Sequence, residues 1–367
     1  MPVMHEGPHK PGKISPEVFA RVIRPRLGRA RAEVRVGPRH GVDVGAVNLG
    51  GGQVLVATTD PLFVVPAYGW ARAAWFALHI VASDAATSGL APRYASVDLN
   101  LPLDMSDGDL GEFWDGFHRA CDAAGIAIVT GHTGRYEGCA YPILGAATVF
   151  CVGPEAGLVT PAMARVGDRV IVTKGAAIES VGQLGVMVPE RIAAACGAAV
   201  ARAAEELFWK MSVVEDARVA AAVGVGDAGV TAMHDATEFG LWGALVEVAD
   251  AAEVGMTIDQ GRIPMPEVVR RVCDLFAMDP FTASSEGTLV ATCRPHQADV
   301  LVARLGDKGI EAAVVGDVVP RAEGVRVFAH GKVAPLVYPA LDPFWGTLGR
   351  ALAAQGKSPL GLPLPKR

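Results

Sequence analysis

The chain has 367 residues, of which 51% are hydrophobic and 20% are charged, and its formal net charge is −6. This composition is typical of soluble globular proteins and excludes disordered and fibrous chains. The net charge predicts no broad basic surface, so we expect no nucleic acid partner. The chain is longer than most domains with a single hydrophobic core, and two domains are therefore expected.

The cysteines and apolar stretches indicate the compartment. None of the six cysteines forms a Cys-x-x-Cys pair, so neither a structural zinc site nor a disulfide framework is expected. The first residues are polar and rich in proline, unlike a signal peptide. The longest apolar stretch, 69–91, contains Arg72, His79 and Asp84, which a membrane span disfavours. We expect a cytoplasmic protein with no membrane partner.

The first half of the chain predicts an α+β layer, with helices on one face of a mixed sheet. A short helix is expected at 16–28, before a basic stretch. Apolar periodicity and turn residues then predict, in order, a strand at 53–60, a helix at 69–88, a strand at 93–102, a helix at 107–125, and strands at 126–131 and 143–153. We expect an N-terminal domain over 1–155 and a linker at 154–166.

The second half predicts a similar α/β module over 160–340, followed by a C-terminal tail over 341–367. It opens with a strand at 168–175 and an alanine-rich helical region at 189–223. A strongly patterned helix follows at 233–255. The remaining expected elements are strands at 256–263, 287–295, 311–319 and 325–332, with helices at 266–278 and 296–309.

Three aspartates of the first half are candidates for chemistry. Asp60 ends an apolar run in TTDP, where Asp-Pro is also a common turn. Asp84 shares a helix face with apolar residues, so it points toward the sheet as a ligand or as a hydrogen-bonded structural residue. Asp43 lies in a glycine-rich segment and is otherwise a solvated loop acid. Carboxylates of this kind are the ligands Mg²⁺ prefers, commonly with bound phosphates.

Two further segments leave alternatives open. In VTGHTGRY, His132 lies between glycines after an apolar run, as a group of a phosphate or metal site or as a turn residue. In HDATEFG, Asp235 and Glu238 have capping-box spacing, although the same helix start also suits an anion. The chain has neither a Walker motif nor a nucleophile elbow.

The ordered motifs resemble a known group. TTDPLFV, SDAATSGLAPRYASVDLNLP, VTGHTGRY, MHDATEFGLWGALVEVADAAEVGMTIDQGRIP and SSEGTLVA together resemble the aminoimidazole ribonucleotide synthetase superfamily, over about residues 10–335. That superfamily includes hydrogenase-maturation carbamoyl dehydratases, thiamine monophosphate kinases and selenophosphate synthetases. The resemblance implies an N-terminal ATP-binding domain that forms a homodimer through its sheet, and a C-terminal domain that closes over the ATP site.

The resemblance also implies roles for single residues. ATP phosphates would be held by Mg²⁺ on Asp43, Asp60 and Asp84, and the reaction would be phosphoryl transfer to an oxygen of a small-molecule substrate. Asp84, His132 and Asp235 are the expected catalytic residues. Relatives carry an acid or a histidine at the position of His132, which would tune the charge near the phosphates. The expected ATP contacts are Lys13, Asp60, Gly131, Thr133, Arg135, Thr237 and Gly240.

Departures from the relatives limit the expected activity. Carbamoyl dehydratases end in a reactive cysteine, whereas this sequence ends SPLGLPLPKR and its last cysteine is Cys293. The sequence is therefore most similar to the synthase-related branch of the superfamily. We expect an ATP- and Mg²⁺-dependent kinase or synthase. The alternatives are a non-catalytic ATP-binding maturation or assembly partner and a ligand-binding protein that takes no nucleotide.

Overall fold

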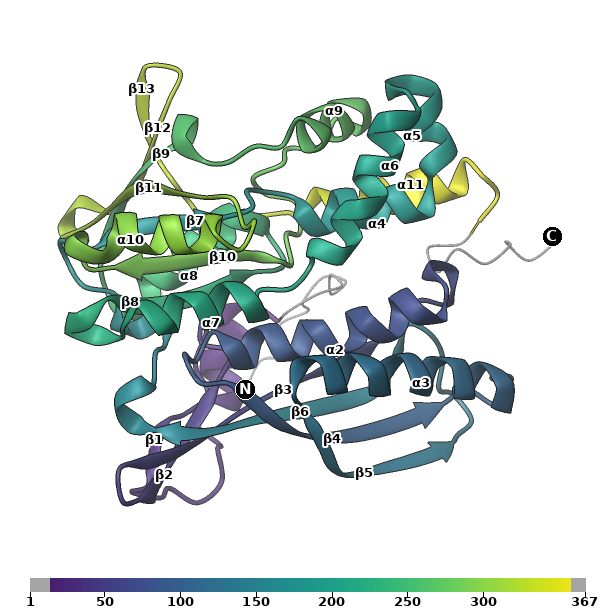
Figure 1. Cartoon of the computed structure of the whole chain (residues 1–367), viewed down its shortest axis with the longest axis horizontal. Coiled ribbons are helices and arrows are strands. Elements are labelled where there is room, and N and C mark those ends of the chain that lie inside the picture. The colour runs from purple at the N-terminus through teal and green to yellow at the C-terminus, as the bar shows by residue number, and fades with distance from the viewer. Residues whose placement is uncertain (1–13, 358–367) are drawn as a thin grey trace, which may run out of the picture.

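A computed structural model describes residues 14–357, and its first half is built on a mixed sheet (Figure 1). The strand order is β1-β2-β3-β6-β4-β5, and every neighbouring pair is antiparallel except β4 and β5. The strands are β1 (Val34–Val36), β2 (Gly45–Gly50), β3 (Gln53–Phe63), β4 (Pro92–Leu101), β5 (Ala127–Arg135) and β6 (Ile143–Pro154). Short α1 (Pro16–Val18) and η1 (Phe19–Ile23) precede this sheet.

Two helices cover one face of the sheet, as the sequence predicts. They are α2 (Trp70–Ala86), which follows the short η2 (Pro66–Tyr68), and α3 (Asp107–Ala124). The hydroxyl of Ser106 caps α3 by accepting a hydrogen bond from the Asp109 amide at 3.0 Å. Along β3, Val54 and Val56 are buried beneath the helices, while Leu55 between them is half-buried on the opposite face. The face away from the helices is therefore open.

The second half is a mixed sheet with helices on both faces. Its order is β13-β12-β9-β11-β7-β10-β8, with only β9 and β12 parallel among neighbours. The strands are β7 (Arg169–Thr173), β8 (Val230–Ala236), β9 (Gly255–Asp259), β10 (Thr288–Cys293), β11 (Ala312–Val319), β12 (Val325–Ala329) and β13 (Lys332–Pro335). The short η3 (Glu155–Gly157) and η4 (Pro161–Met163) connect the two halves.

Alternation along β7 divides the core of this half. Val170 and Val172 pack with α8 (Gly240–Ala252), whereas Ile171 packs with α7 (Val214–Val223) and α10 (Pro295–Gly306) on the other face. The helices of the half are α4 (Ile178–Met187), α5 (Pro189–Cys196), α6 (Ala198–Glu206), α7 (Val214–Val223), α8 (Gly240–Ala252), α9 (Glu267–Phe276), α10 (Pro295–Gly306) and α11 (Pro343–Ala353). The one-turn helices are η5 (Leu207–Lys210), η6 (Gly226–Ala228), η7 (Gln260–Arg262) and η8 (Arg321–Glu323).

A further core cluster joins the two halves. Phe76 of α2 packs in one cluster with residues of α4 and α9 and with Phe344 and Leu348 of α11. The segment expected to be a tail from residue 341 therefore begins with a helix that is buried along one side. The mixed α/β architecture with two sheets is confirmed, while the proposed division into domains at 155, 160 and 340 stays a prediction.

Two local expectations are wrong. Residues 131–135 are not a turn after a strand, because β5 continues through Arg135 and pairs in parallel with β4 over that length. Asp60 likewise does not end its strand, because β3 runs on to Phe63. Within residues 14–357, no helix combines the length and apolarity needed to cross a bilayer.

The burial of α11 makes a stability prediction. Replacing Phe344, which is fully buried, with alanine should lower the free energy of unfolding by about 3–5 kcal/mol, because it leaves a cavity in the shared core. Chemical denaturation followed by circular dichroism measures this. The control is Val337→Ala, since Val337 is 73% exposed and its loss should change stability little. Equal stability of the two variants would show that α11 is not part of the core.

Candidate functional site

Acidic side chains from both halves line one cavity between the sheets. Asp60 of β3 and Asp84 of α2 come from the first half, and Glu179, Glu238 and Glu286 come from the second. Asp84 is only 6% exposed, and it lies on the same face of α2 as two other lining residues of the cavity, Phe76 and Ile80. The spacing of four residues between them is the helical repeat that aligns side chains along one face.

Thr58 ties the strand carrying Asp60 to this helix. Its buried hydroxyl lies 2.8 Å from the backbone oxygen of Asp43 and 3.3 Å from Oδ2 of Asp84. One hydroxyl proton serves both acceptors, with the shorter contact to the Asp43 backbone. Thr58 therefore fixes the segment before β2 and the Asp84 carboxylate relative to each other.

A buried histidine forms an ion pair between the two halves. His234 of β8 has its Nδ1 atom 3.1 Å from Oδ2 of Asp43, and its Nε2 atom 2.8 Å from Oε2 of Glu247 on α8. Burial alone would lower the pKa of His234, but the adjacent Asp43 and Glu247 carboxylates outweigh it and raise the pKa to about 10. His234 is therefore an imidazolium at neutral pH. The hydroxyl of Tyr338 donates to the other oxygen of Glu247 at 2.8 Å.

Asp235 adds a third carboxylate beside this histidine. Ligand atoms of Asp43, His234 and Asp235 lie within 4.8 Å of one another, a separation that one metal ion can bridge. Asp235 is 1% exposed, and its Oδ1 atom lies 3.9 Å from Nδ1 of His234. The carboxylates of this group suit a hard cation, whereas the charged imidazole ring offers no lone pair.

Two glutamates form another part of the cavity wall. Oε1 of Glu179 accepts a hydrogen bond from Gln183 at 2.8 Å, and Oε2 accepts one from the Glu286 amide at 3.1 Å. Burial raises the pKa of Glu179 to about 8. Burial, followed by the charges of Asp235 and Glu179, raises the pKa of Glu286 well above its ordinary value. These carboxyl groups hold protons at a pH where ordinary glutamates are ionised.

The structure does not bring the segment from Gly131 to Arg135 to this cavity. Gly131 pairs with Val97, Val97 with Ala147, and Ala147 with Asp60, so Gly131 and Asp60 lie three strands apart in one row. At roughly 4.8 Å per strand, this separation is about 14 Å.

The side chains of that segment have local partners. Nε2 of His132 lies 2.6 Å from the Tyr136 hydroxyl, and Arg135 donates to Asp107 at 2.8 Å. Thr133 is exposed on the same edge strand. Lys13 lies outside the described residues. The roles expected for these four residues are therefore still predictions.

The second predicted segment departs from its expected local structure. Asp235 belongs to β8, and α8 begins only at Gly240, so the capping-box interpretation is wrong. Gly240 has φ +60°, and a Cβ there would meet the Ala283 carbonyl oxygen at 2.5 Å. Glycine is thus required at this turn by the backbone. Thr237, which precedes the turn, lines the cavity.

Several residues of the site were not identified from the sequence. They are Thr58, Glu179, His234, Glu247 and Glu286. Glu286 lies in the SSEG motif, which contributed only to the resemblance, and His234 directly precedes a predicted site residue. These residues share burial where the two halves meet, and apolar periodicity in the sequence does not reveal such burial.

Comparisons with known proteins agree with this architecture. Residues 41–153 match the N-terminal domain and residues 165–328 the C-terminal domain of AIR synthase related proteins. The carbamoyl dehydratase HypE of Rhizobium leguminosarum bv. viciae is 31% identical over 290 residues, covering 77% of this chain and 78% of that protein. The thiamine-monophosphate kinase of Halobacterium salinarum is 31% identical over 258 residues, covering 70% and 79%. A hydrogenase maturation protein HypE solved in complex with ATP shares the fold, with a TM-score of 0.59, 20% identity and coverage of 91% and 97%.

The pKa of His234 predicts how stability depends on pH. A group whose pKa rises from 6.5 to about 10 on folding stabilises the fold fully below pH 6.5, and that contribution is lost as pH rises through 10. His234→Gln should remove it, costing roughly 3–5 kcal/mol at low pH because two carboxylates lose their buried cation. The difference between wild type and variant should shrink from pH 6.5 to 10 in urea denaturation.

The matched control is His296→Gln, since His296 is an exposed residue of α10. Taking the difference between two proteins cancels the titration of Glu179 and Glu286, which is common to both. A difference that stays constant with pH would mean that His234 is neutral in the folded protein.

Proposed function

Because the chain belongs to the AIR synthase related family, we propose that it is an ATP-dependent enzyme that phosphorylates an oxygen of a small polar substrate. The observation that carries this proposal is the convergence of Asp60, Asp84, Glu179 and Glu286, from both halves, on one cavity. Phosphoryl transfer depends on positioning and charge neutralisation more than on a protein nucleophile. The kinase and the ATP complex among the similar proteins support the choice of ATP.

Carboxylate oxygens at this cavity fit Mg²⁺. We assign Asp60 and Asp84, which line the cavity, as residues that hold it, and Asp43 and Asp235, whose ligand atoms lie within 4.8 Å of each other, as further candidates. Bound there, Mg²⁺ would neutralise the charge of phosphate oxygens. Thr58 orients Asp84, and His234 keeps a positive charge beside Asp43 and Asp235. Thr237 and Gly240 would face the phosphates from the turn before α8.

The glutamates provide the base that takes the proton from the substrate hydroxyl. When the substrate hydroxyl attacks the terminal phosphorus of ATP, its O–H proton must move to a base as the new P–O bond forms and the bond to ADP breaks. Glu286 lines the cavity and has a high proton affinity because of burial and its acidic neighbours. We assign its ionised form, which becomes populated as pH rises through the raised pKa, as the proton acceptor. Glu179 positions it by accepting from its backbone amide.

We also propose a homodimer through the open face of the first sheet. Half-buried Leu55 and Phe150 and exposed Tyr94 lie on that face, which α2 and α3 leave uncovered. Apolar side chains on an uncovered sheet face favour association. His132 and Arg135 lie on the edge of the same sheet, so we propose that Gly131, His132, Thr133 and Arg135 reach nucleotide phosphates only in the dimer.

Removing a carboxylate tests the metal assignment. Asp84→Asn should weaken Mg²⁺-dependent ATP binding at least about tenfold, or roughly 1.4 kcal/mol, in calorimetry with and without Mg²⁺. Asp115→Asn serves as the control, because Asp115 is exposed on α3 and should leave binding unchanged. Tight ATP binding by wild type without ADP release in any pool of small metabolites would instead favour a non-catalytic binding role.

Glu286→Gln separates binding from chemistry. The variant should bind ATP as wild type does but release ADP at least about 100-fold more slowly, because it cannot accept a proton. In wild type, turnover should rise with pH through a pKa above the ordinary glutamate range. An unchanged turnover rate in the variant would remove Glu286 from the mechanism.

A charge on the open face tests the dimer. Phe150→Glu should give a monomer in analytical ultracentrifugation, because the carboxylate would be buried at the interface. Val300→Glu, on the exposed side of α10, should leave the mass in solution unchanged. If wild type itself sediments as a monomer, the dimer proposal is wrong.

A further inference from the structure

A second cavity lies between the two halves, on a different face of α2. It is lined by Trp75 and His79 of α2, the end of α3, the turn after β7, the segment 207–216, and the loop before β11. Along α2, Trp75 and His79 point about 100° away from the face that carries Phe76, Ile80 and Asp84. The cavity is therefore separate from the candidate active site, and nothing in the proposed phosphoryl transfer uses it.

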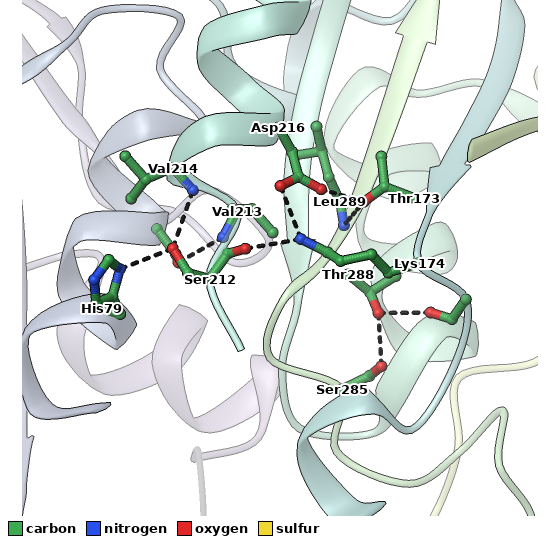
Figure 2. Close-up of polar contacts among 12 residues, drawn as sticks. His79, Thr173, Lys174, Ser212, Val213, Val214, Asp216, Ser285, Thr288 and Leu289 are labelled. Carbon is green, nitrogen blue, oxygen red and sulfur yellow. Dashed lines mark hydrogen bonds and ion pairs between the residues drawn. The ribbon is translucent and has the colours of Figure 1, made fainter. Parts of the chain in front are cut away.

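Lys174 presents a buried cation to this cavity. It follows β7 with φ +58°, and its side chain is 11% exposed. Its Nζ atom donates to the Ser212 backbone oxygen at 2.8 Å and to Oδ2 of Asp216 at 2.8 Å (Figure 2). An ammonium group has three N–H donors, and no acceptor within residues 14–357 is recorded for the third. One N–H donor of the Lys174 ammonium group is therefore available to a ligand in the cavity.

His79 presents a second donor. Its Nδ1 atom lies 2.8 Å from the Ser212 hydroxyl, which also accepts a hydrogen bond from the Val214 amide at 3.3 Å (Figure 2). The Ser212 oxygen has two lone pairs, so it can either donate to Nδ1 or accept from it; we assign the tautomer in which it donates and the neutral ring carries its own proton on Nε2. Burial lowers the pKa of His79 to about 4, which keeps the ring neutral. His79 lines the cavity, and no acceptor for Nε2 is recorded among the described residues.

The remaining charges favour an anion. Asp216 is satisfied by Lys174 and by the hydroxyl of Thr173, and Arg218 holds Glu215 through two hydrogen bonds. Lys210 and Lys308 are exposed lining residues with no ion pair recorded in the described chain, and Glu311 is the one lining acid without such a cation. Leu207, Ile310 and Trp75 supply apolar wall. The cavity thus combines two donors, two exposed rim lysines and apolar surface.

We propose that this cavity binds a small organic anion, with its carboxylate or phosphate group held by Lys174 and His79 and its apolar body against Trp75, Leu207 and Ile310. Charge-assisted hydrogen bonds of this kind contribute more than neutral ones and select an oxyanion over a neutral analogue. The proposal does not depend on ATP binding or on phosphoryl transfer.

Binding is measured with benzoate, phenyl phosphate and neutral benzamide as probes, by tryptophan fluorescence and calorimetry. Trp75 and Trp209 line the cavity and report occupancy. Benzoate or phenyl phosphate should bind saturably, and the stronger of the two identifies the head group. Benzamide should bind at least about tenfold more weakly, because it lacks the charge. Equal binding of benzamide and benzoate, or no saturable binding of any probe, overturns the proposal.

Variants locate the probe. His79→Phe keeps a planar aromatic ring but removes both ring nitrogens, and Lys210→Ala with Lys308→Ala removes the rim charge. Each should weaken binding at least about fivefold. Lys332→Ala, an exposed lysine of β13, should change nothing. Asp84→Asn should also leave binding unchanged, whereas a loss there would place the probe in the candidate active site and contradict the proposal. These substitutions leave the buried Lys174–Asp216 pair intact.

Discussion

The structure depends on the electrostatic cost of gathering carboxylates between two sheets. Glu286 shows this cost directly, because burial and the charges of Asp235 and Glu179 raise its pKa well above the ordinary range. Like charges in a medium of low polarity cannot all be ionised without a cation or a proton. Protonation of Glu179 and Glu286 and the positive charge of His234 reduce the repulsion between the buried carboxylates. Such a site favours cations, or polyanions that bring their own counterions, over apolar ligands.

Helix α2 lies between the two sheets (Figure 1) and contributes residues to both cavities. One face carries Asp84 to the acidic cavity, and the adjacent face carries Trp75 and His79 to the second. Ser83, between these faces, accepts a hydrogen bond from the Val213 amide at 3.1 Å and so anchors α2 to the second half. Any shift of the helix therefore alters both cavities together.

Sequence periodicity predicted most helices and strands, because each buries one apolar face with a regular repeat. It also identified Asp84, since a carboxylate on an apolar helix face must have a structural or chemical reason to be there. Periodicity failed where tertiary context decides the structure. The glycines of β5 indicate a turn, yet Gly131 lies so close to the Val97 carbonyl in the sheet that a Cβ would approach it to 2.1 Å. Glu179, His234 and Glu286 acquire their properties only when distant segments meet, which local patterns cannot report.

The contact between His234 and Asp43 has a consequence for modular exchange. Each half matches its own family domain, which suggests interchangeable units, but this ion pair draws one partner from each. A chimera that takes either half from a relative without the matching residue would lose this ion pair, leaving His234 with Glu247 alone or Asp43 without its cation. Residues of the two halves that meet at this interface must therefore match each other. The interface between the halves, rather than either sheet alone, limits which substitutions the chain tolerates.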